Sequence, residues 1–162
     1  MKALVTGGGG FLGRAIVERL VARGDSVRSL ARGAYPDLAA LGVEVVRGDI
    51  EDAATVRDAC KGVDVVFHSA AKPGIWGSRE SYHGPNVRGT ENVLAGMRAE
   101  GVRRLIHTSS PSVVFSGKDL EGVDERVPYP EHFEAFYPET KALSEKLVIA
   151  ANVYDKRDAR AN

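Results

Sequence analysis

Short apolar runs alternate with amphipathic segments along this chain. The apolar runs have the length of buried strands, about four to eight residues, and several are rich in Val, Leu and Ile. The pattern predicts strands at Lys2–Thr6, Ser26–Ala31, Val43–Arg47, Asp64–His68 and Arg103–Thr108.

The segments between these runs carry helix signals. Apolar residues recur in them at helical spacing. Asp52 can cap a helix that runs to about Cys60, and Gly42, Gly62 and Gly101 stand where helices are expected to end. Helices are therefore predicted at Phe11–Arg23, Pro36–Leu41, Asp52–Cys60, Asn86–Glu100 and Tyr137–Ala151.

Strand–helix alternation predicts a parallel sheet covered by helices on both faces. Right-handed crossovers then give an α/β doubly wound fold with strand order 3-2-1-4-5, counted along the chain. Residues 1–151 are expected to form this single domain. Residues 152–162 are polar and charged, and we expect a frayed tail there.

Composition narrows the class of protein. The 162 residues carry as many basic as acidic side chains, so nothing indicates nucleic acid or an anionic membrane as a partner. No apolar run approaches the roughly 20 residues of a membrane span. Lys2 leads directly into a strand, so no signal peptide is expected. Cys60 has no partner for a disulfide, and the four histidines lack metal-ligand spacing, which favours a cytoplasmic protein without a metal site.

A glycine-rich segment, Thr6–Gly13, joins the first predicted strand to the first predicted helix. Gly8, Gly10 and Gly13 fit the spacing G-x-G-x-x-G, while Gly7, Gly10 and Gly13 fit G-x-x-G-x-x-G. Glycines let the backbone approach a pyrophosphate closely, and the helix N-terminus offers free N–H groups. The segment predicts a dinucleotide site rather than a loop without a ligand.

The end of the second strand favours NADP(H) over NAD(H). Proteins that prefer NAD place an acid there to bind the ribose 2′-hydroxyl. Here Ala31 occupies the tip and Arg32 follows, while Asp25 lies too early. An arginine can bind a 2′-phosphate through charge-assisted bonds, although NAD(H) stays open. After the third strand, Asp49 could bind the adenine amino group and Ile50 could pack on the ring; a turn or helix-capping role for Asp49 is the alternative.

Catalytic chemistry is suggested by Tyr137 and Lys141 at the start of the last helix. Four residues apart, they share a helical face. A nearby ammonium lowers the pKa of a phenol, which suits proton transfer to a carbonyl oxygen. Ser109 and Ser110 follow the fifth strand, at the sheet edge where ligands bind, and a serine there can stabilise negative charge on that oxygen. Taken alone, the Tyr–Lys spacing is common, but its combination with the glycine segment is rare.

Six motifs occur in order along the chain: Thr6-Gly7-x-x-Gly10-x-x-Gly13, Asp49-Ile50, His68-Ser69-Ala70-Ala71, Asn86-Val87-Arg88-Gly89-Thr90, Thr108-Ser109-Ser110 and Tyr137-x-x-x-Lys141. Together they resemble the extended branch of the short-chain dehydrogenase/reductase family, the epimerase/dehydratase superfamily with a Rossmann-type fold. Within it, segments 71–78 and 108–114 are similar to the 3β-hydroxysteroid dehydrogenase-like group and to bacterial reductases of 2-alkyl-3-oxoalkanoates.

The resemblance implies a role for each matching residue. Tyr137 would be the general acid, Lys141 would assist it and hold the nicotinamide ribose, and Ser110 would be the catalytic serine. Ala70 and Ala71 would line the cofactor's path. The candidate cofactor-binding residues are Gly7, Gly10, Phe11, Leu12, Gly13, Arg32, Asp49, Ile50, Ala70, Ala71, Asn86, Tyr137 and Lys141.

Two features depart from the family pattern. Pro85 precedes Asn86 where the family has a continuous helix, and it would bend or start the helix there. The chain also stops soon after the last helix, so most of the region that would bind a substrate is expected to be missing.

The resemblance favours a reductase that converts a ketone to an alcohol, with a small molecule as its partner. A sugar-nucleotide epimerase or dehydratase of the same branch is an alternative, and so is a dinucleotide-binding fragment without catalysis. The last two helices could also pair with a second copy in a homodimer.

Overall fold

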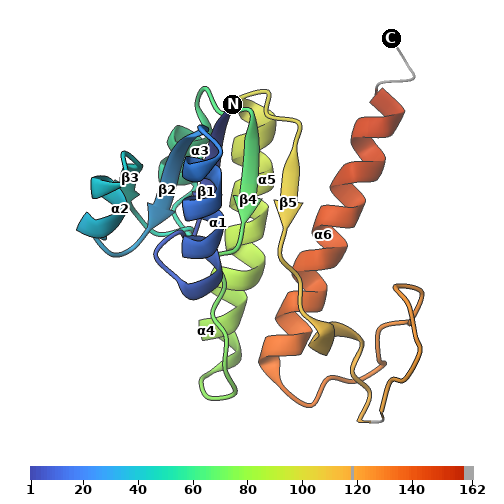
Figure 1. The fold of residues 1–162 in the computed structure, drawn as a ribbon. Helices are drawn as coiled ribbons and strands as arrows, with labels where there is room; N and C mark the ends of the chain where they lie inside the picture. Colours follow the sequence, from blue (N-terminus) through green and yellow to red (C-terminus); the bar gives the residue numbers. More distant parts are fainter. Residues whose placement is uncertain (118, 159–162) are drawn as a thin grey trace.

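A computed structural model describes residues 1–117 and 119–158 of the chain (Figure 1). Its five strands form one parallel sheet in the order β3-β2-β1-β4-β5, which confirms the predicted topology. The strands are β1 (Lys2–Thr6), β2 (Ser26–Ala31), β3 (Glu44–Arg47), β4 (Val65–His68) and β5 (Leu105–His107).

The helices alternate with the strands as predicted. Asp52 caps its helix, because its carboxylate accepts hydrogen bonds from the backbone N–H groups of Ala54 and Thr55. A short 3-10 helix, η2 (Pro111–Val114), was not predicted. The α-helices are α1 (Phe11–Ala22), α2 (Pro36–Ala40), α3 (Ala53–Cys60), α4 (Arg79–His83), α5 (Gly89–Ala99) and α6 (Phe136–Asp158).

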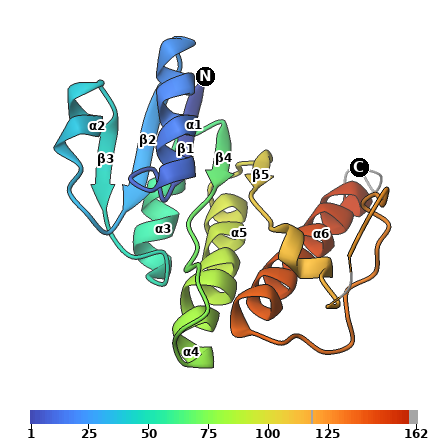
Figure 2. The same ribbon diagram turned by 60° about the horizontal axis from the view of Figure 1, so that its bottom comes forward.

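Two apolar cores lie on opposite faces of the sheet, because successive strand residues point to opposite sides. On one face α1 and α2 cover Ala3, Val5 and Val27. On the other face α3 and α5 cover Leu4 and Val66. The carboxyl ends of the strands and the first turns of α1 and α6 lie at the same end of the domain (Figures 1 and 2).

The helix expected to begin at Asn86 begins earlier. Ser78 caps α4 by accepting from the N–H of Ser81, and the chain then continues through a π-helical turn, η1 (Gly84–Arg88), into α5. In the wider turn the N–H of Gly89 bonds to the carbonyl of Gly84. Pro85, which has no N–H to donate, is accommodated at the first turn of this π segment, so it neither starts nor ends the helix.

The last helix is longer than expected, because α6 continues past Ala151 to Asp158. The expected frayed tail is therefore helical over 152–158, and its remaining residues lie outside the described part of the chain. No glycine or proline interrupts this stretch, so nothing local ends the helix.

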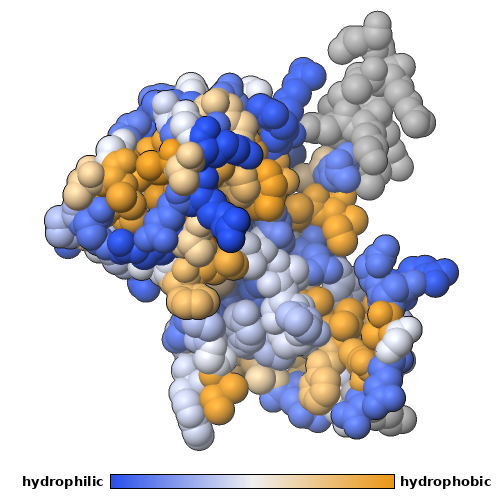
Figure 3. Space-filling model, viewed as in Figure 1, coloured by the Kyte–Doolittle hydropathy of each residue, from blue (hydrophilic) through white to orange (hydrophobic). Residues whose placement is uncertain are grey.

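Apolar surface is exposed beside β5 and along the lower part of α6 and the segment before it (Figure 3). Ile106 on β5 and Phe136 on α6 are 46% and 41% exposed. Among the helices of the described residues, none has both the length and the apolar character required to cross a bilayer.

Candidate functional site

A cavity of about 710 Å³ opens at the carboxyl edge of the sheet. It extends from the turn after β1 across the tips of β2 and β3 and along the segment after β4. Predicted cofactor residues that line it are Gly7, Gly10, Arg32, Asp49, Ile50, Ala70 and Ala71.

The glycine-rich turn is built for close backbone approach. Gly7 has φ +72°, and a Cβ there would lie 2.9 Å from the Cα of Ala70. Its carbonyl accepts the N–H of Gly10 at 2.9 Å, and a Cβ on Gly13 would collide with that same carbonyl. Only glycine fits at residues 7 and 13, which leaves a backbone cradle at the start of α1.

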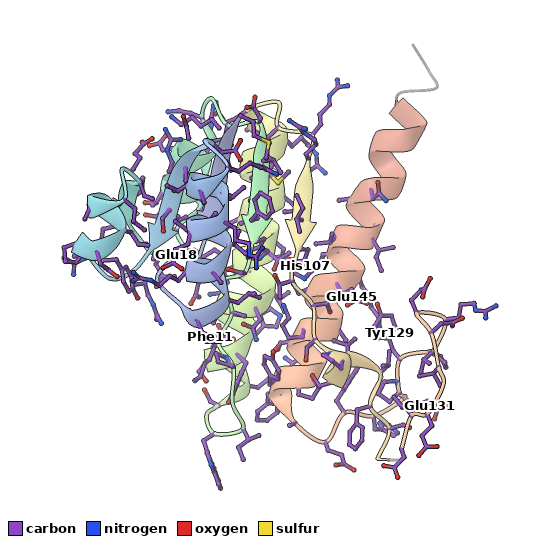
Figure 4. The ribbon with its side chains drawn as sticks, in the orientation of Figure 1. Phe11, Glu18, His107, Tyr129, Glu131 and Glu145 are labelled. Carbon is purple, nitrogen blue, oxygen red and sulfur yellow. The ribbon has the colours of Figure 1, made fainter. Side chains whose placement is uncertain are left out.

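Phe11 and Leu12 contribute no side chain to the cavity. Phe11 is 98% exposed at the first turn of α1, and Leu12 is 46% exposed (Figure 4). Only their backbone N–H groups, at the positive end of the helix, could serve a phosphate there.

The tips of β2 and β3 place a cation and a carboxylate on the same cavity wall. Arg32 lines the cavity and forms no ion pair within the described residues. Asp49 accepts the N–H of Glu51 at 3.0 Å, so it holds a turn as well as facing the cavity. Ile50 lines the cavity but is mainly a core residue, 8% exposed and packed on Gly89.

Asn86 is buried behind the cavity and does not line it. Its Oδ1 accepts the N–H of Lys72 at 2.7 Å, and its Nδ2 donates to Oγ1 of Thr140 at 3.0 Å. The side chain thus ties the segment after β4 to α6. This is a bracing role.

Lys141 is the buried cation of the site. Its Nζ donates to the carbonyl of Thr108 at 2.6 Å, and its residue surface is 4% exposed. Burial lowers the pKa of Lys141 to about 8, and the carboxylate of Glu145, one turn further along α6, opposes this shift. The amine is therefore fixed at the end of β5, two residues before Ser110.

Neither Tyr137 nor Ser110 forms a hydrogen bond to this amine within the described residues. Tyr137 is half-buried in the first turn of α6, and its hydroxyl forms no hydrogen bond within the described residues. Ser110 caps η2, where its Oγ accepts the N–H of Ser112 at 3.2 Å and lies 2.8 Å from the Oγ of the same residue. Because α6 packs on η2, all three predicted catalytic residues lie on one side of the sheet edge.

A buried chain of hydrogen bonds lies behind these residues, and sequence analysis did not predict it. Thr90 Oγ1 donates to the carbonyl of Asn86 at 2.7 Å, so it must accept from His68 Nε2 at 3.0 Å and from Ser144 Oγ at 2.8 Å. Ser144 in turn accepts from Nε2 of His107 at 3.3 Å. The chain joins β4, α5, α6 and β5 through side chains alone.

The two histidines in this series of hydrogen bonds, His68 and His107, are neutral. Burial lowers the pKa of His68 to about 3, helped by His107 and Lys141. Burial and the charge of Lys141 lower the pKa of His107 to about 4. The centres of the two rings lie 5.2 Å apart. Because both rings are neutral, Lys141 carries the positive charge of this buried group.

Glu145 lies between the end of β5 and the segment that precedes α6 (Figure 4). It accepts hydrogen bonds from the hydroxyls of Ser109 and of Tyr129, the latter at 2.8 Å. Burial, then the bond to this carboxylate, raises the pKa of Tyr129 to about 12. The contact fixes the preceding segment on α6, and the sequence offered no local signal for it.

Lys72 is a further cation of the cavity wall that sequence analysis did not single out. Its Nζ donates to Oγ of Ser81 at 2.7 Å and lies 4.6 Å from the centre of the Tyr82 ring. The one available signal was its place directly after Ala70-Ala71, the end of the third motif.

A parallel sheet in this order, with a glycine-rich turn at its first crossover, defines a dinucleotide-binding Rossmann domain. A model of the 3-beta hydroxysteroid dehydrogenase/isomerase family matches residues 4–160, and the chain belongs to this family.

Named relatives share about half of their own length with this chain. A 2-alkyl-3-oxoalkanoate reductase of Stenotrophomonas maltophilia is 51% identical over 94% of this chain and 47% of that protein. A 3 beta-hydroxysteroid dehydrogenase/Delta 5→4-isomerase of Mycobacterium tuberculosis is 42% identical over 95% of this chain and 44% of that protein. The chain thus spans a little under half the length of these relatives.

A solved structure matches the fold in the same way. A short-chain dehydrogenase/reductase superfamily protein from Agrobacterium tumefaciens, crystallised with bound NAD, has a TM-score of 0.80 and 34% identity. The match covers 91% of this chain and 44% of that one. The predicted resemblance to the short-chain dehydrogenase/reductase family is confirmed.

Proposed function

We propose that this chain is the cofactor-binding and catalytic part of an NADP(H)-dependent reductase that converts a ketone to an alcohol. One observation carries the proposal: the buried amine of Lys141, a residue one helical turn from Tyr137, is fixed on the carbonyl of Thr108, two residues before Ser110. The proposed acid, cation and hydroxyl donor follow the end of β5, at the same carboxyl edge of the sheet as the cavity, although none of the three lines that cavity.

Each of these residues has a definite task in the proposed step. A bound nicotinamide would supply the hydride that adds to the carbonyl carbon. Tyr137 gives its phenolic proton to the carbonyl oxygen, which becomes the alcohol, and Ser110 donates a hydrogen bond to that oxygen. Lys141 stabilises the phenolate that remains, until a proton from solvent restores the phenol.

The residues of the cavity fit a nicotinamide dinucleotide. Gly7 and Gly13 leave the backbone bare where a pyrophosphate would approach, and α1 points its positive end there. The bound NAD of the A. tumefaciens protein supports this assignment. Arg32 on the cavity wall, with Ala31 in place of an acid at the tip of β2, favours the 2′-phosphate of NADP(H).

For the substrate, we propose a 3-oxoalkanoate or a related β-keto compound. The name of the S. maltophilia relative supports this class of substrate. An epimerase or dehydratase is less well supported, because no carboxylate stands at the tip of β2 and the family model that matches is that of hydroxysteroid dehydrogenases.

Replacing Tyr137 by Phe tests the proposal. With NADPH and a 2-alkyl-3-oxoalkanoate, kcat is expected to fall by about a hundredfold or more, since a general acid is lost. The Kd for NADPH, measured by quenching of cofactor fluorescence, should stay nearly the same. Tyr129→Phe is the matched control, because it removes a hydroxyl that bonds to Glu145, and its kcat should change little.

Two results would contradict the proposal. One is near-normal turnover by the Tyr137→Phe variant. The other is a wild-type chain that binds NADPH but reduces no ketone, which would support a non-catalytic binding fragment instead.

A further inference from the structure

Tyr35 has an unusual backbone conformation at the cavity wall. With φ 44° and ψ 64°, it is the one residue other than glycine with a positive φ in the described part of the chain. A bulky side chain in this left-handed region is an outlier, and such outliers often mark ligand sites. Pro36, the first residue of α2, follows it directly.

This conformation lays the Tyr35 ring against two glycines. The ring occupies the space that a Cβ on Gly9 would need. A Cβ on Gly33 would lie 2.7 Å from Cε2 of the ring and 3.2 Å from its hydroxyl oxygen. The ring therefore bridges the glycine-rich turn and the residue that follows Arg32, and it lines the same cavity.

The hydroxyl of Tyr35 is free to meet a ligand. It forms no hydrogen bond to any described residue, whereas the hydroxyls of Tyr82 and Tyr129 are both bonded. The ring itself packs partly on the core below α1 and α2. Packing thus holds the ring at the cavity wall, with its hydroxyl unbonded within the described residues.

A second arginine joins Arg32 at this place. Arg47 ends β3 directly opposite Ala31 of β2, and its Nε donates to the carbonyl of Arg32 at 3.1 Å. Neither guanidinium forms an ion pair within the described residues. The nearby carboxylate of Asp37 is instead paired with Arg14. At the tip of β2 there are therefore two guanidinium groups without an ion pair and one hydroxyl without a hydrogen bond within the described residues. Asp49 is the carboxylate on the same cavity wall, and Arg47 lies behind Arg32 without lining the cavity.

We propose that Arg47 and Tyr35 are specificity-determining residues that bind, together with Arg32, the 2′-phosphate of the cofactor. A phosphate monoester carries up to two negative charges and accepts several hydrogen bonds, which matches two guanidinium groups and one hydroxyl. This inference rests on the proposed use of NADP(H). The motif at the end of β2 indicates Arg32 alone, and the fold adds Arg47 and Tyr35.

The test compares ligands that differ only in the 2′-phosphate. The Kd values of 2′,5′-ADP and 5′-AMP are measured by titration calorimetry for the wild type and for Arg47→Gln and Tyr35→Phe. Each variant should lose about tenfold in affinity for 2′,5′-ADP, the usual effect of one charge-assisted bond, and bind 5′-AMP unchanged. Tyr35→Phe keeps the ring on Gly9, so the turn should keep its shape.

Arg98→Gln provides the matched control. Arg98 is an exposed arginine near the end of α5, away from this cavity, and its loss removes the same net charge. It should leave the Kd of 2′,5′-ADP within about twofold, since exposed charges far apart are screened. Unfolding midpoints measured without ligand show whether each variant is folded.

Four outcomes would overturn the inference. Arg47→Gln could behave like Arg98→Gln, 5′-AMP affinity could fall as much as that of 2′,5′-ADP, or inorganic phosphate could compete as well as 2′,5′-ADP does. A wild type that prefers 5′-AMP would remove the inference but not the reductase function, because Tyr137-dependent turnover with NADH is measured separately.

Discussion

The buried amine of Lys141 makes the stability of the protein depend on pH in a predictable direction. Burial lowers its pKa to about 8 from the ordinary 10.5. Between these values the unfolded chain binds a proton that the folded chain has released. The free energy of unfolding must therefore rise with pH in this window, by up to about 1.4 kcal/mol per pH unit.

Comparison with the Lys141→Met variant isolates this effect. Both proteins are unfolded with urea at a series of pH values, and their free energies of unfolding are subtracted, which cancels the other titrating groups. From pH 8 to about 9.5 the wild type should gain about 2 kcal/mol relative to the variant. Below pH 8 the difference should be flat, because Lys141 is charged in both states.

A difference that stays flat or falls above pH 8 would refute this reasoning. It would mean that the Lys141 ammonium is not destabilised at its place beside Thr108. Glu145→Gln gives a second check, since removing the carboxylate that raises the pKa of Lys141 should move the onset of the rise to lower pH.

Two further predictions concern the buried chain and the glycine-rich turn. Thr90→Val should lower the free energy of unfolding by about 1–3 kcal/mol, because Nε2 of His68 loses its hydrogen-bond partner in the buried interior. Thr90→Ser keeps a hydroxyl and should lower the free energy of unfolding less. Equal urea midpoints for the two variants would contradict this prediction. Gly13→Ala should weaken NADPH binding and lower the unfolding midpoint, because the new Cβ collides with the carbonyl of Gly7. This collision should outweigh the preference of alanine for helices, which is about 1 kcal/mol. A stabilised variant with normal NADPH binding would contradict this prediction.

Local signals predicted most of the fold correctly. The strand order follows from alternation and right-handed crossovers, which need no knowledge of particular contacts. The cap at Asp52 was read correctly because capping is a contact between close neighbours in sequence. The start of the long helix was wrong because Pro85 was treated as a boundary, whereas a π turn accommodates it and Ser78 caps the helix earlier.

The candidate site could be predicted only in part. Gly7, Arg32 and Ala70 line one cavity as expected, because the carboxyl ends of parallel strands meet at one edge. Six other residues of the predicted cofactor-binding set do not line it: Phe11, Leu12, Gly13, Asn86, Tyr137 and Lys141. The catalytic roles of Tyr137, Lys141 and Ser110 stay predictions.

The sequence by itself determined the sheet, the glycine-rich turn and the nature of the catalytic candidates, because each depends on residues a few positions apart. Only the tertiary structure decided that Lys141 is buried on Thr108, that Tyr35 rests on Gly9, and that Arg47 lies beside Arg32. These contacts join residues from different strands and helices. Packing, rather than local backbone preference, brings these residues together, so the spacing of residues along the sequence cannot predict their contacts.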